Sequence, residues 1–268
     1  MPLPAENLGH KAFPQPTDQN VLVWRYIDLA KLIHWLATDQ LVLSRIDTLR
    51  DPYEGRHGRR FQAFVEDFTL VMLGDRSEQR QRMAREHARL RTQGEGAWRG
   101  STFVSCWCAD GPRESEAMWR IHASANASVA LVLPYARLRE SLNDPQMYIG
   151  EVGYFDYEMG VVDSGNAFNA VMHKREEFSY EHEVRIVKMD AAAFEWIMPA
   201  ADGPLAIDPD SVGVPRTIST TWRVSEHIER VVVSPYASAW QRDAIVSVVR
   251  AMAPALEGRI RDSVMRNQ

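Results

Sequence analysis

Short apolar runs, none long enough to span a membrane, alternate with amphipathic segments, and this pattern constrains the fold most. The run Val21–Tyr26 predicts a strand. Asp28 can cap a following helix. The apolar residues of that helix recur with the spacing of one buried face: Leu29, Leu32, Ile33 and Leu36. A second strand is predicted over Leu41–Ile46, so the chain opens as strand, helix, strand.

The same alternation continues to the C-terminus. Further strands are predicted at 101–108, 129–133, 148–157, 180–189 and 228–234. Helices are predicted at 115–122, 167–177 and 237–252. The strongly charged segment 61–93 predicts two helices with a break at Gly74-Asp75. Loops are predicted at 94–100 and in the Pro-, Gly- and Asp-rich segment 198–215.

These elements predict a single α+β domain with a mixed, mainly antiparallel sheet and flanking helices. We place it at residues 20–268, after a flexible N-terminal tail at 1–19 and with a helical, basic insert at about 56–98. A chain of 268 residues can bury an ample core without disulfide or metal links. Its composition, 45% apolar and 25% charged, excludes a disordered or fibrous protein.

Cysteine use and the N-terminal residues bear on the compartment. Only Cys106 and Cys108 occur, and a bridge between residues two apart in a strand would distort the backbone. The first 20 residues have no continuous apolar run, which argues against a signal peptide or membrane span. We therefore expect a cytoplasmic protein without a membrane partner; its oligomeric state is left open.

Charge is unevenly distributed. The net charge is −5, but the stretch from Arg50 to Arg99 has 11 arginines against 8 acidic residues. This region can face an anionic partner such as a nucleic acid. The alternative is a solvated helix face, because acids such as Glu78 and Glu86 are interleaved with the arginines.

The segment Glu181–Arg185 is the most informative for chemistry. In a strand, Glu181, Glu183 and Arg185 share one face. If that face lines a cleft, one carboxylate can act as a base or bind a sugar hydroxyl while Arg185 orients its neighbour. If it faces solvent, the pattern is an exposed charge pair.

Two further segments suggest a ligand site. Arg25 lies between Trp24 and Tyr26, so its guanidinium can bind phosphate while an adjacent ring stacks on a base or nicotinamide. The alternative is a structural arginine. In the strand 101–108, Ser105 and Trp107 share the face expected to meet a ligand, and the two cysteines share the face expected to enter the core.

Several common sites are absent from the sequence. It contains no phosphate-binding Gly-x-x-x-x-Gly-Lys-Ser/Thr loop, no Gly-x-Gly-x-x-Gly, no Gly-x-Ser-x-Gly and no His-Glu-x-x-His. The two cysteines lack a second pair or a His spacing suited to zinc, and we predict no metal site. ATPases, Rossmann dehydrogenases and zinc hydrolases are thereby disfavoured.

Five short motifs, in this order, resemble the bacterial domain of unknown function 2971 family over about 21–189. They are Trp24-Arg25-Tyr26, Asp51-Pro52-Tyr53-Glu54-Gly55, Ser105-Cys106-Trp107, Met118-Trp119 and Tyr180-Glu181-His182-Glu183-Val184-Arg185. Two residues depart from the family pattern: Arg50 stands where the family usually has Asn, and His122 where Tyr tends to follow Met-Trp.

The order arginine, serine, Glu-x-Glu also resembles that of ADP-ribosyltransferases, which split NAD between nicotinamide and ribose. This resemblance implies that Arg25 holds the phosphates, Ser105 positions the nicotinamide and Glu183 promotes transfer. Glu181 would assist the acceptor. The other expected contacts are Tyr26 and Trp107 for NAD, and Tyr180, Arg185, Asp51 and Glu54 for the acceptor substrate. Because Ser-Thr-Ser is missing, Ser101-Thr102 is a rival for the serine role.

The leading hypothesis is therefore an NAD-consuming transferase or glycohydrolase, a toxin, effector or phage-defence component that modifies nucleic acid or protein. A carboxylate beside the ribose can stabilise the oxocarbenium-like state of glycosidic cleavage. A second hypothesis is a non-enzymatic module that binds nucleic acid or protein. A third is a divalent-metal nuclease whose ligands would be Asp51, Glu54, Glu181 and Glu183.

Overall fold

The computed structural model describes residues 3–4, 7, 9–74, 77–111, 113–122, 127–198 and 207–266. The strands are β1 Leu22–Asp28, β2 Gln40–Arg45, β3 Thr102–Cys108, β4 Ser128–Pro134, β5 Met147–Glu151, β6 Gly153–Phe155, β7 His173–Arg175, β8 Glu183–Met189, β9 Thr217–Thr221, β10 Arg230–Val233 and β11 Ile260–Asp262. The α-helices are α2 Leu29–Thr38, α3 Phe61–Leu73, α4 Glu78–Ser101, α5 Glu116–His122, α6 Tyr135–Ser141, α7 Ala167–Val171, α8 Ala191–Ile197, α9 Val224–His227 and α10 Ala239–Met252. Three 3₁₀ helices are η1 Ile46–Thr48, η2 Glu176–Glu181 and η3 Pro254–Arg259.

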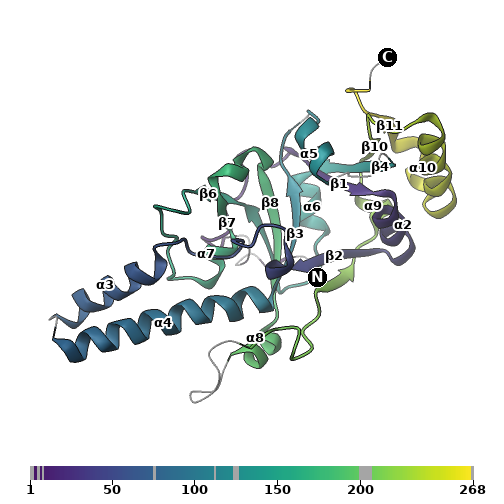
Figure 1. Ribbon diagram of the computed structural model, residues 1–268. Coiled ribbons are helices and arrows are strands. Elements are labelled where there is room, and N and C mark those ends of the chain that lie inside the picture. The colour runs from purple at the N-terminus through teal and green to yellow at the C-terminus, as the bar shows by residue number, and fades with distance from the viewer. Residues whose placement is uncertain are drawn as a thin grey trace.

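Nine of these strands form one mixed sheet with helices packed around it (Figure 1). Seven strands lie in the order β11-β10-β4-β1-β3-β2-β9, and β8 pairs with both β3 and β5. Every pair in this sheet is antiparallel except β10 with β11. β6 and β7 form a separate parallel pair. The predicted single α+β domain with a mainly antiparallel sheet is confirmed.

Along one edge of β3, two different strands pair with its two ends and leave its middle unpaired. The other edge of β3 pairs with β8 over its whole length. On the partly paired edge, β1 pairs only where Trp24 faces Cys108, and β2 pairs only near the opposite end, at Phe103 and Val104. The backbone of Cys106 therefore lies in a gap between β1 and β2. This gap, which periodicity does not predict, positions the cavity described below.

One face of the sheet carries the main apolar core. Val23 and Ile27 of β1 and Phe103 and Trp107 of β3 belong to it, together with side chains from α2, α6 and α10. The Trp107 ring lies 6.3 Å from the Trp35 ring, centroid to centroid. Burial of these large side chains supplies the main driving force for the fold.

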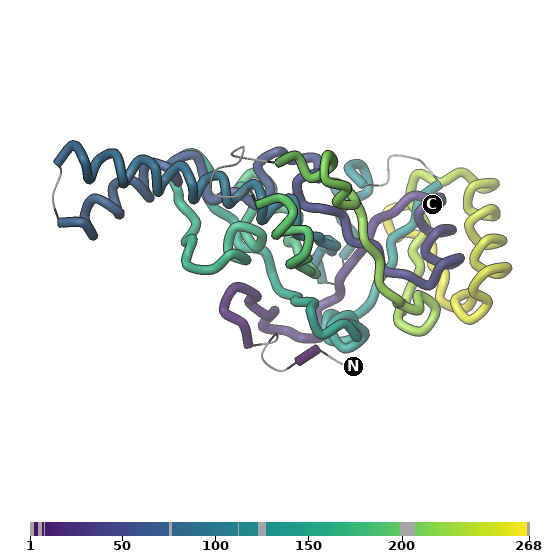
Figure 2. Tube along the Cα trace, turned by 90° about the horizontal axis from the view of Figure 1, so that it is seen from below, coloured from purple at the N-terminus to yellow at the C-terminus, as the bar shows by residue number. Residues whose placement is uncertain are grey.

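Helices α3 and α4 form a hairpin that projects from the body of the molecule (Figures 1 and 2). Gly74 has a φ of 78° and ends α3, as predicted, while Asp75 lies outside the described residues. The predicted loop at 94–100 is wrong, because α4 continues through it to Ser101. Packing of Trp98 on Phe194, with ring centroids 4.2 Å apart, favours the longer helix over the local propensities of its glycines.

Three other predicted boundaries shift. The strand at 148–157 is interrupted between β5 and β6, and the helix at 167–177 ends at Val171, before β7. The strand at 180–189 begins only at Glu183, because His182 has a φ of 39° and ends η2. Residues 199–206 of the predicted loop at 198–215 lie outside the described part of the chain.

The described part of the N-terminal segment is packed against the sheet, so the prediction of a flexible tail is wrong for it. Phe13 is only 1% exposed and stacks on Tyr148 with ring centroids 4.8 Å apart. A Cβ at Gly150 would lie 2.7 Å from the Phe13 backbone, so this close approach requires glycine. Among the described residues, no helix has the length and apolar character needed to cross a membrane.

Candidate functional site

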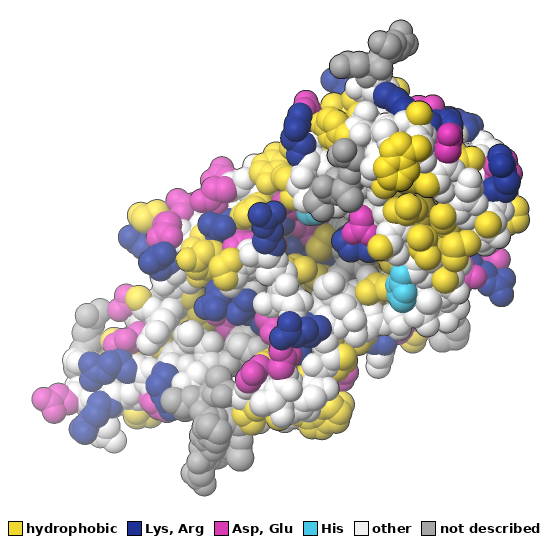
Figure 3. Space-filling model, turned by 45° about the vertical axis from the view of Figure 1, so that its right-hand side comes forward, with side chains coloured by type: hydrophobic (Ala, Val, Ile, Leu, Met, Phe, Trp, Pro, Cys, Tyr) yellow, Lys and Arg dark blue, Asp and Glu magenta, His cyan; other side chains and the backbone are white. Residues whose placement is uncertain are grey.

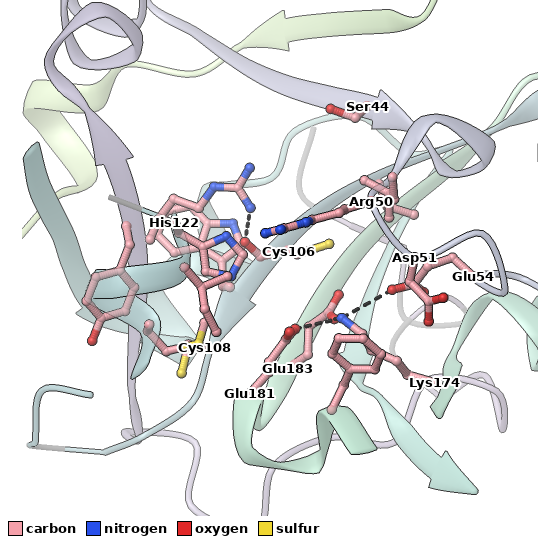
Figure 4. A pocket seen from close by; sticks show the side chains of 18 of the residues that line it. Ser44, Arg50, Asp51, Glu54, Cys106, Cys108, His122, Lys174, Glu181 and Glu183 are labelled. Carbon is pink, nitrogen blue, oxygen red and sulfur yellow. Dashed lines mark hydrogen bonds and ion pairs between the residues drawn. The ribbon is translucent and has the colours of Figure 1, made fainter. Parts of the chain in front are cut away.

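A cavity of about 580 Å³ opens beside the gap in the sheet, within the size range usual for ligand sites. Its walls come from β1, β3, α5, the loop before α3, and the segment from β7 to the start of β8 (Figure 4). Eight of the ten predicted site residues line it: Arg25, Tyr26, Asp51, Glu54, Trp107, Tyr180, Glu181 and Glu183. The other two, Ser105 and Arg185, are absent from its lining.

Three glutamates converge on one ammonium group at the cavity wall (Figure 4). Lys174 Nζ lies 2.6 Å from Glu181 Oε2 and 3.1 Å from both Glu54 Oε1 and Glu183 Oε2. The carboxylates raise the Lys174 pKa despite its burial, which by itself lowers it. Sequence reasoning missed Lys174; its rarity was the available signal, since only four of the 31 basic residues are lysines.

Arg185 lies beneath this cluster. It is 0% exposed, its Nε donates to Glu183 Oε1 at 2.7 Å, and its Nη2 donates to Glu54 Oε2 at 3.0 Å. The prediction that Arg185 contacts a substrate is therefore wrong. Its guanidinium balances two carboxylates that would otherwise be buried and uncompensated. Strand periodicity correctly placed Arg185 on the same face as Glu183, but it could not show that Arg185 is fully buried.

The two glutamates of the Glu-x-Glu pair have opposite pKa shifts. Burial alone would raise the pKa of Glu183, but Arg185 and Lys174 outweigh it and lower that pKa to about 2. Burial raises the pKa of Glu181 against the opposing effect of Lys174. Glu181 Oε1 has no hydrogen-bond partner among the described residues, whereas both oxygens of Glu183 are in ion pairs. Glu181 is thus the carboxylate that remains able to exchange a proton with a ligand.

The lowered Glu183 pKa predicts acid sensitivity. Its contribution to stability is fully present above the unfolded value of about 4.3 and is lost as pH falls towards about 2. We expect protonation of Glu183 to lower the free energy of unfolding by about 3 kcal/mol in all, with most of this loss below pH 4.5. Urea unfolding at pH 7, 5 and 3 measures the loss. A free energy of unfolding that stays constant from pH 5 to 2.5 would contradict this assignment.

The loop carrying Asp51 and Glu54 is held by a neighbouring arginine. Arg175 forms a bidentate pair with Asp51, at 3.0 Å from Nε to Oδ2 and 3.2 Å from Nη2 to Oδ1. Its guanidinium also lies over the rings of Tyr53 and Phe178, at 4.8 and 5.1 Å from their centroids. Asp51 is therefore engaged by Arg175 and anchors the cavity wall.

Arg25 enters the gap between β1 and β2. Its Nη1 donates to the carbonyl of Cys106, the backbone group exposed by the gap. Its Nε is buried without a hydrogen-bond partner among the described residues, and Arg25 makes no ion pair there. Burial lowers its pKa, yet an arginine stays protonated at neutral pH. Arg25 thus offers an unneutralised positive charge to the cavity.

Arg50 supplies a second cation. Its side chain extends into the cavity towards Cys106, on the side away from Lys174 (Figure 4). It makes no hydrogen bond or ion pair within the described structure and is exposed. The cavity therefore has two free guanidinium groups on one side and a carboxylate cluster on the other.

The two faces of β3 are the reverse of those predicted. Ser105 is 1% exposed and its hydroxyl has no hydrogen-bond partner among the described residues. The Trp107 ring packs in the core although the residue borders the cavity. Cys106 and Cys108 line the cavity instead. Burial raises the Cys106 pKa to about 12, so its thiol is neutral and a poor nucleophile. Strand periodicity predicts which residues share a face, not which face the rest of the chain covers.

The remaining predicted contacts differ in how available they are. Tyr180 is 42% exposed at the cavity, and Tyr26 is 5% exposed with its hydroxyl accepting from the Ser115 N–H at 3.1 Å. The rival pair Ser101-Thr102 is buried, and neither residue lines the cavity. Neither Ser105 nor Ser101-Thr102 is therefore placed to position a nicotinamide in the cavity. Among the described residues, Ser44 does contribute a hydroxyl to it.

The convergent carboxylates are arranged around an ammonium group. In the described ranges, no group of three or more His, Cys, Asp or Glu side chains has the geometry of a metal site. The space shared by Glu54, Glu181 and Glu183 holds Lys174 Nζ.

Comparisons with protein-family models, curated proteins and solved structures found no match. Membership of the family that the motifs resemble stays a prediction.

Proposed function

We propose that this cavity binds NAD and cleaves its nicotinamide–ribose bond, with transfer of ADP-ribose to a nucleic-acid or protein acceptor. The observation that carries the proposal is the division of charge in one cavity, with Arg25 and Arg50 unpaired on one side and Glu181 on the other. A phosphate-rich ligand with a glycosidic bond complements both. The cytoplasmic setting and the toxin, effector or defence role expected from the sequence belong to the same proposal.

Arg25 and Arg50 would hold the diphosphate. Arg25 Nη1 is anchored to the Cys106 carbonyl, so its remaining donors are pre-oriented. Arg50 is exposed and extends into the same side of the cavity as Arg25, so it can close on the ligand there. Charge-assisted hydrogen bonds of this kind contribute about 1.5–3 kcal/mol each.

The carboxylate cluster would act on the ribose. Cleavage of an N-glycosidic bond builds positive charge on the ribose ring, which a fixed carboxylate stabilises. Glu183 is held negative by Lys174 and Arg185, and Glu181 keeps an oxygen free to accept a proton from an acceptor hydroxyl or water. The catalytic role thus shifts from Glu183, as the motif implied, to Glu181, with Glu183 as a positioning residue.

Nicotinamide release from NAD tests the proposal. We expect the wild-type protein to release nicotinamide, and Arg25→Met to raise the KM at least tenfold with a smaller change in kcat, because a phosphate contact is lost. Arg120→Met, which alters an exposed arginine of α5, should leave both constants unchanged. If the wild-type protein neither binds nor cleaves NAD, the proposal is refuted.

A second candidate function is ligand binding without chemistry. It is favoured by one observation: both oxygens of Glu183 are in ion pairs, as in a purely structural carboxylate. This alternative predicts that NAD or another anionic ligand binds, that Arg25→Met weakens binding, and that no nicotinamide appears. The same assay, combined with a calorimetric titration, separates the two functions.

A further inference from the structure

A second cavity, of about 330 Å³, lies across the loop at 51–58 from the first. Residues of this loop contribute to both cavities: Asp51 and Glu54 line the first, whereas Tyr53 and Arg56 line the second. The far wall is formed by α4 near Glu95, at the base of the projecting hairpin. None of its lining residues also lines the first cavity, although Tyr53 packs against Arg175 of the first cavity.

The second cavity is held open by the backbone. Arg59 N donates to Tyr157 O at 2.9 Å, which fixes the loop beside the segment that carries Tyr157. Gly58 has a φ of 108°, and a Cβ there would lie 2.5 Å from Gly160 O. This close approach, possible only for glycine, places Tyr157 beside Tyr53. The cavity is therefore formed before any ligand binds.

A buried carboxylate in its wall lacks one partner. Glu95 is 7% exposed, and its Oε1 accepts from both His57 N at 2.7 Å and His57 Nδ1 at 2.9 Å. Oε2 has no hydrogen-bond partner among the described residues. Oε2 is not among the fully buried atoms of the described residues, and Glu95 lines the cavity, so a ligand N–H group there can replace water as the donor to Oε2.

Aromatic and cationic groups surround this acceptor. The rings of Tyr53 and Tyr157 lie 4.5 Å apart, centroid to centroid, with an interplanar angle of 51°, so a planar ring can stack on one of them at a time. Arg56 makes no ion pair within the described residues; its Nε donates to Pro52 O at 3.2 Å. Arg59 is 61% exposed at the rim, where its Nε pairs with Glu158 Oε2 at 2.6 Å and its Nη groups stay available to a ligand. Figure 3 shows Lys and Arg side chains spread over the face that includes the hairpin.

We propose that the second cavity binds a nucleotide whose base carries an amino group. The base stacks on one of the two tyrosine rings, Tyr53 or Tyr157, and donates its amino N–H to Glu95 Oε2, while Arg56 and Arg59 bind the phosphate. Uracil is disfavoured, because carbonyls flank its only N–H and the carboxylate repels them. This site is independent of NAD cleavage in the first cavity.

Calorimetric titration with CMP, GMP, AMP and UMP tests the site. We expect the three amino-bearing nucleotides to bind at least tenfold more tightly than UMP. In Glu95→Gln, both His57 donors hold the amide oxygen, so the amide NH₂ faces the cavity. CMP binding should weaken at least tenfold, and the preference over UMP should shrink or reverse. Arg56→Met should weaken all four nucleotides equally, and it leaves the buried wall intact.

Three controls make the outcome decisive. Glu86→Gln, on the exposed side of α4, and Arg120→Met, on the exposed side of α5, should leave nucleotide binding unchanged. The third control is the single-stranded oligonucleotide dC6. If dC6 binds more tightly than CMP and its affinity falls steeply with salt, the ligand is a nucleotide within a single-stranded nucleic acid. If dC6 and CMP bind with equal affinity, the ligand is a free nucleotide. The proposal is overturned if none of the four nucleotides binds at millimolar concentration, or if the base preference survives in folded Glu95→Gln protein.

Discussion

Replacing Lys174 by methionine is expected to lower the free energy of unfolding by about 3–5 kcal/mol, the usual cost of removing one partner from a buried ion cluster. The ammonium group contacts three buried glutamates, and only Arg185 would remain to balance them. Urea unfolding at pH 7, monitored by tryptophan fluorescence, measures the change. Lys174→Arg, which keeps the charge, should recover part of it.

The loss should also depend on pH. Without Lys174, the carboxylates must take up protons to stay buried, so the penalty should be larger at pH 8 than at pH 5. Lys188→Met is the matched control on β8, because among the described residues Lys188 forms its ion pair with Asp144 alone, at 2.6 Å, and is partly exposed. Such pairs contribute about 0–1 kcal/mol. A Lys174→Met protein as stable as Lys188→Met at both pH values would show that the cluster adds nothing to the fold.

Replacing Glu181 by glutamine is expected to lower kcat for nicotinamide release about 100-fold or more, with little change in KM. Folding should persist, because Lys174 keeps its contacts with Glu54 and Glu183. Glu177→Gln, an exposed position on the same 3₁₀ helix, is the matched control and should keep wild-type rates. Stopped assays of nicotinamide release, with the Tm of each variant, give both readouts.

The pH profile distinguishes a catalytic Glu181 from a structural one. Burial raises its pKa, so wild-type kcat/KM should fall as pH drops through that raised value, because the carboxylate takes up its proton. In Glu181→Gln that acidic limb should disappear. Equal rates and equal pH profiles in the two proteins would remove Glu181 from the mechanism. Glu183→Gln is less informative, because it leaves two buried cations unbalanced.

Much of the fold was predictable because its elements carry their own periodicity. The opening strand, helix and strand, the two charged helices, and the closing helix at Ala239–Met252 all follow from apolar spacing. Errors fall where tertiary contacts override local preference. Helix α4 continues past three glycines because Trp98 packs on Phe194, and β8 starts late because His182 adopts a positive φ.

The candidate site was only partly predictable for a similar reason. Arg25, Glu181 and Glu183 are on chemically distinctive segments, so residue type marked them out. Lys174 lies outside those segments, seven residues before Glu181, and the turn through η2 and the pairing of β7 with β6 place it among the glutamates. The tail at residues 9–19 was misjudged because its few apolar residues, such as Phe13, carry no periodic signal.

The fold class, the order of most elements and eight of the residues that line the candidate cavity follow from the sequence, because they depend on spacing and side-chain chemistry. The sequence does not show which face of β3 is buried, that Arg185 is buried beneath the cavity, or that Glu181 rather than Glu183 keeps an oxygen without a partner among the described residues. Burial and ion pairing depend on segments brought together from distant parts of the chain, and no local pattern records those contacts.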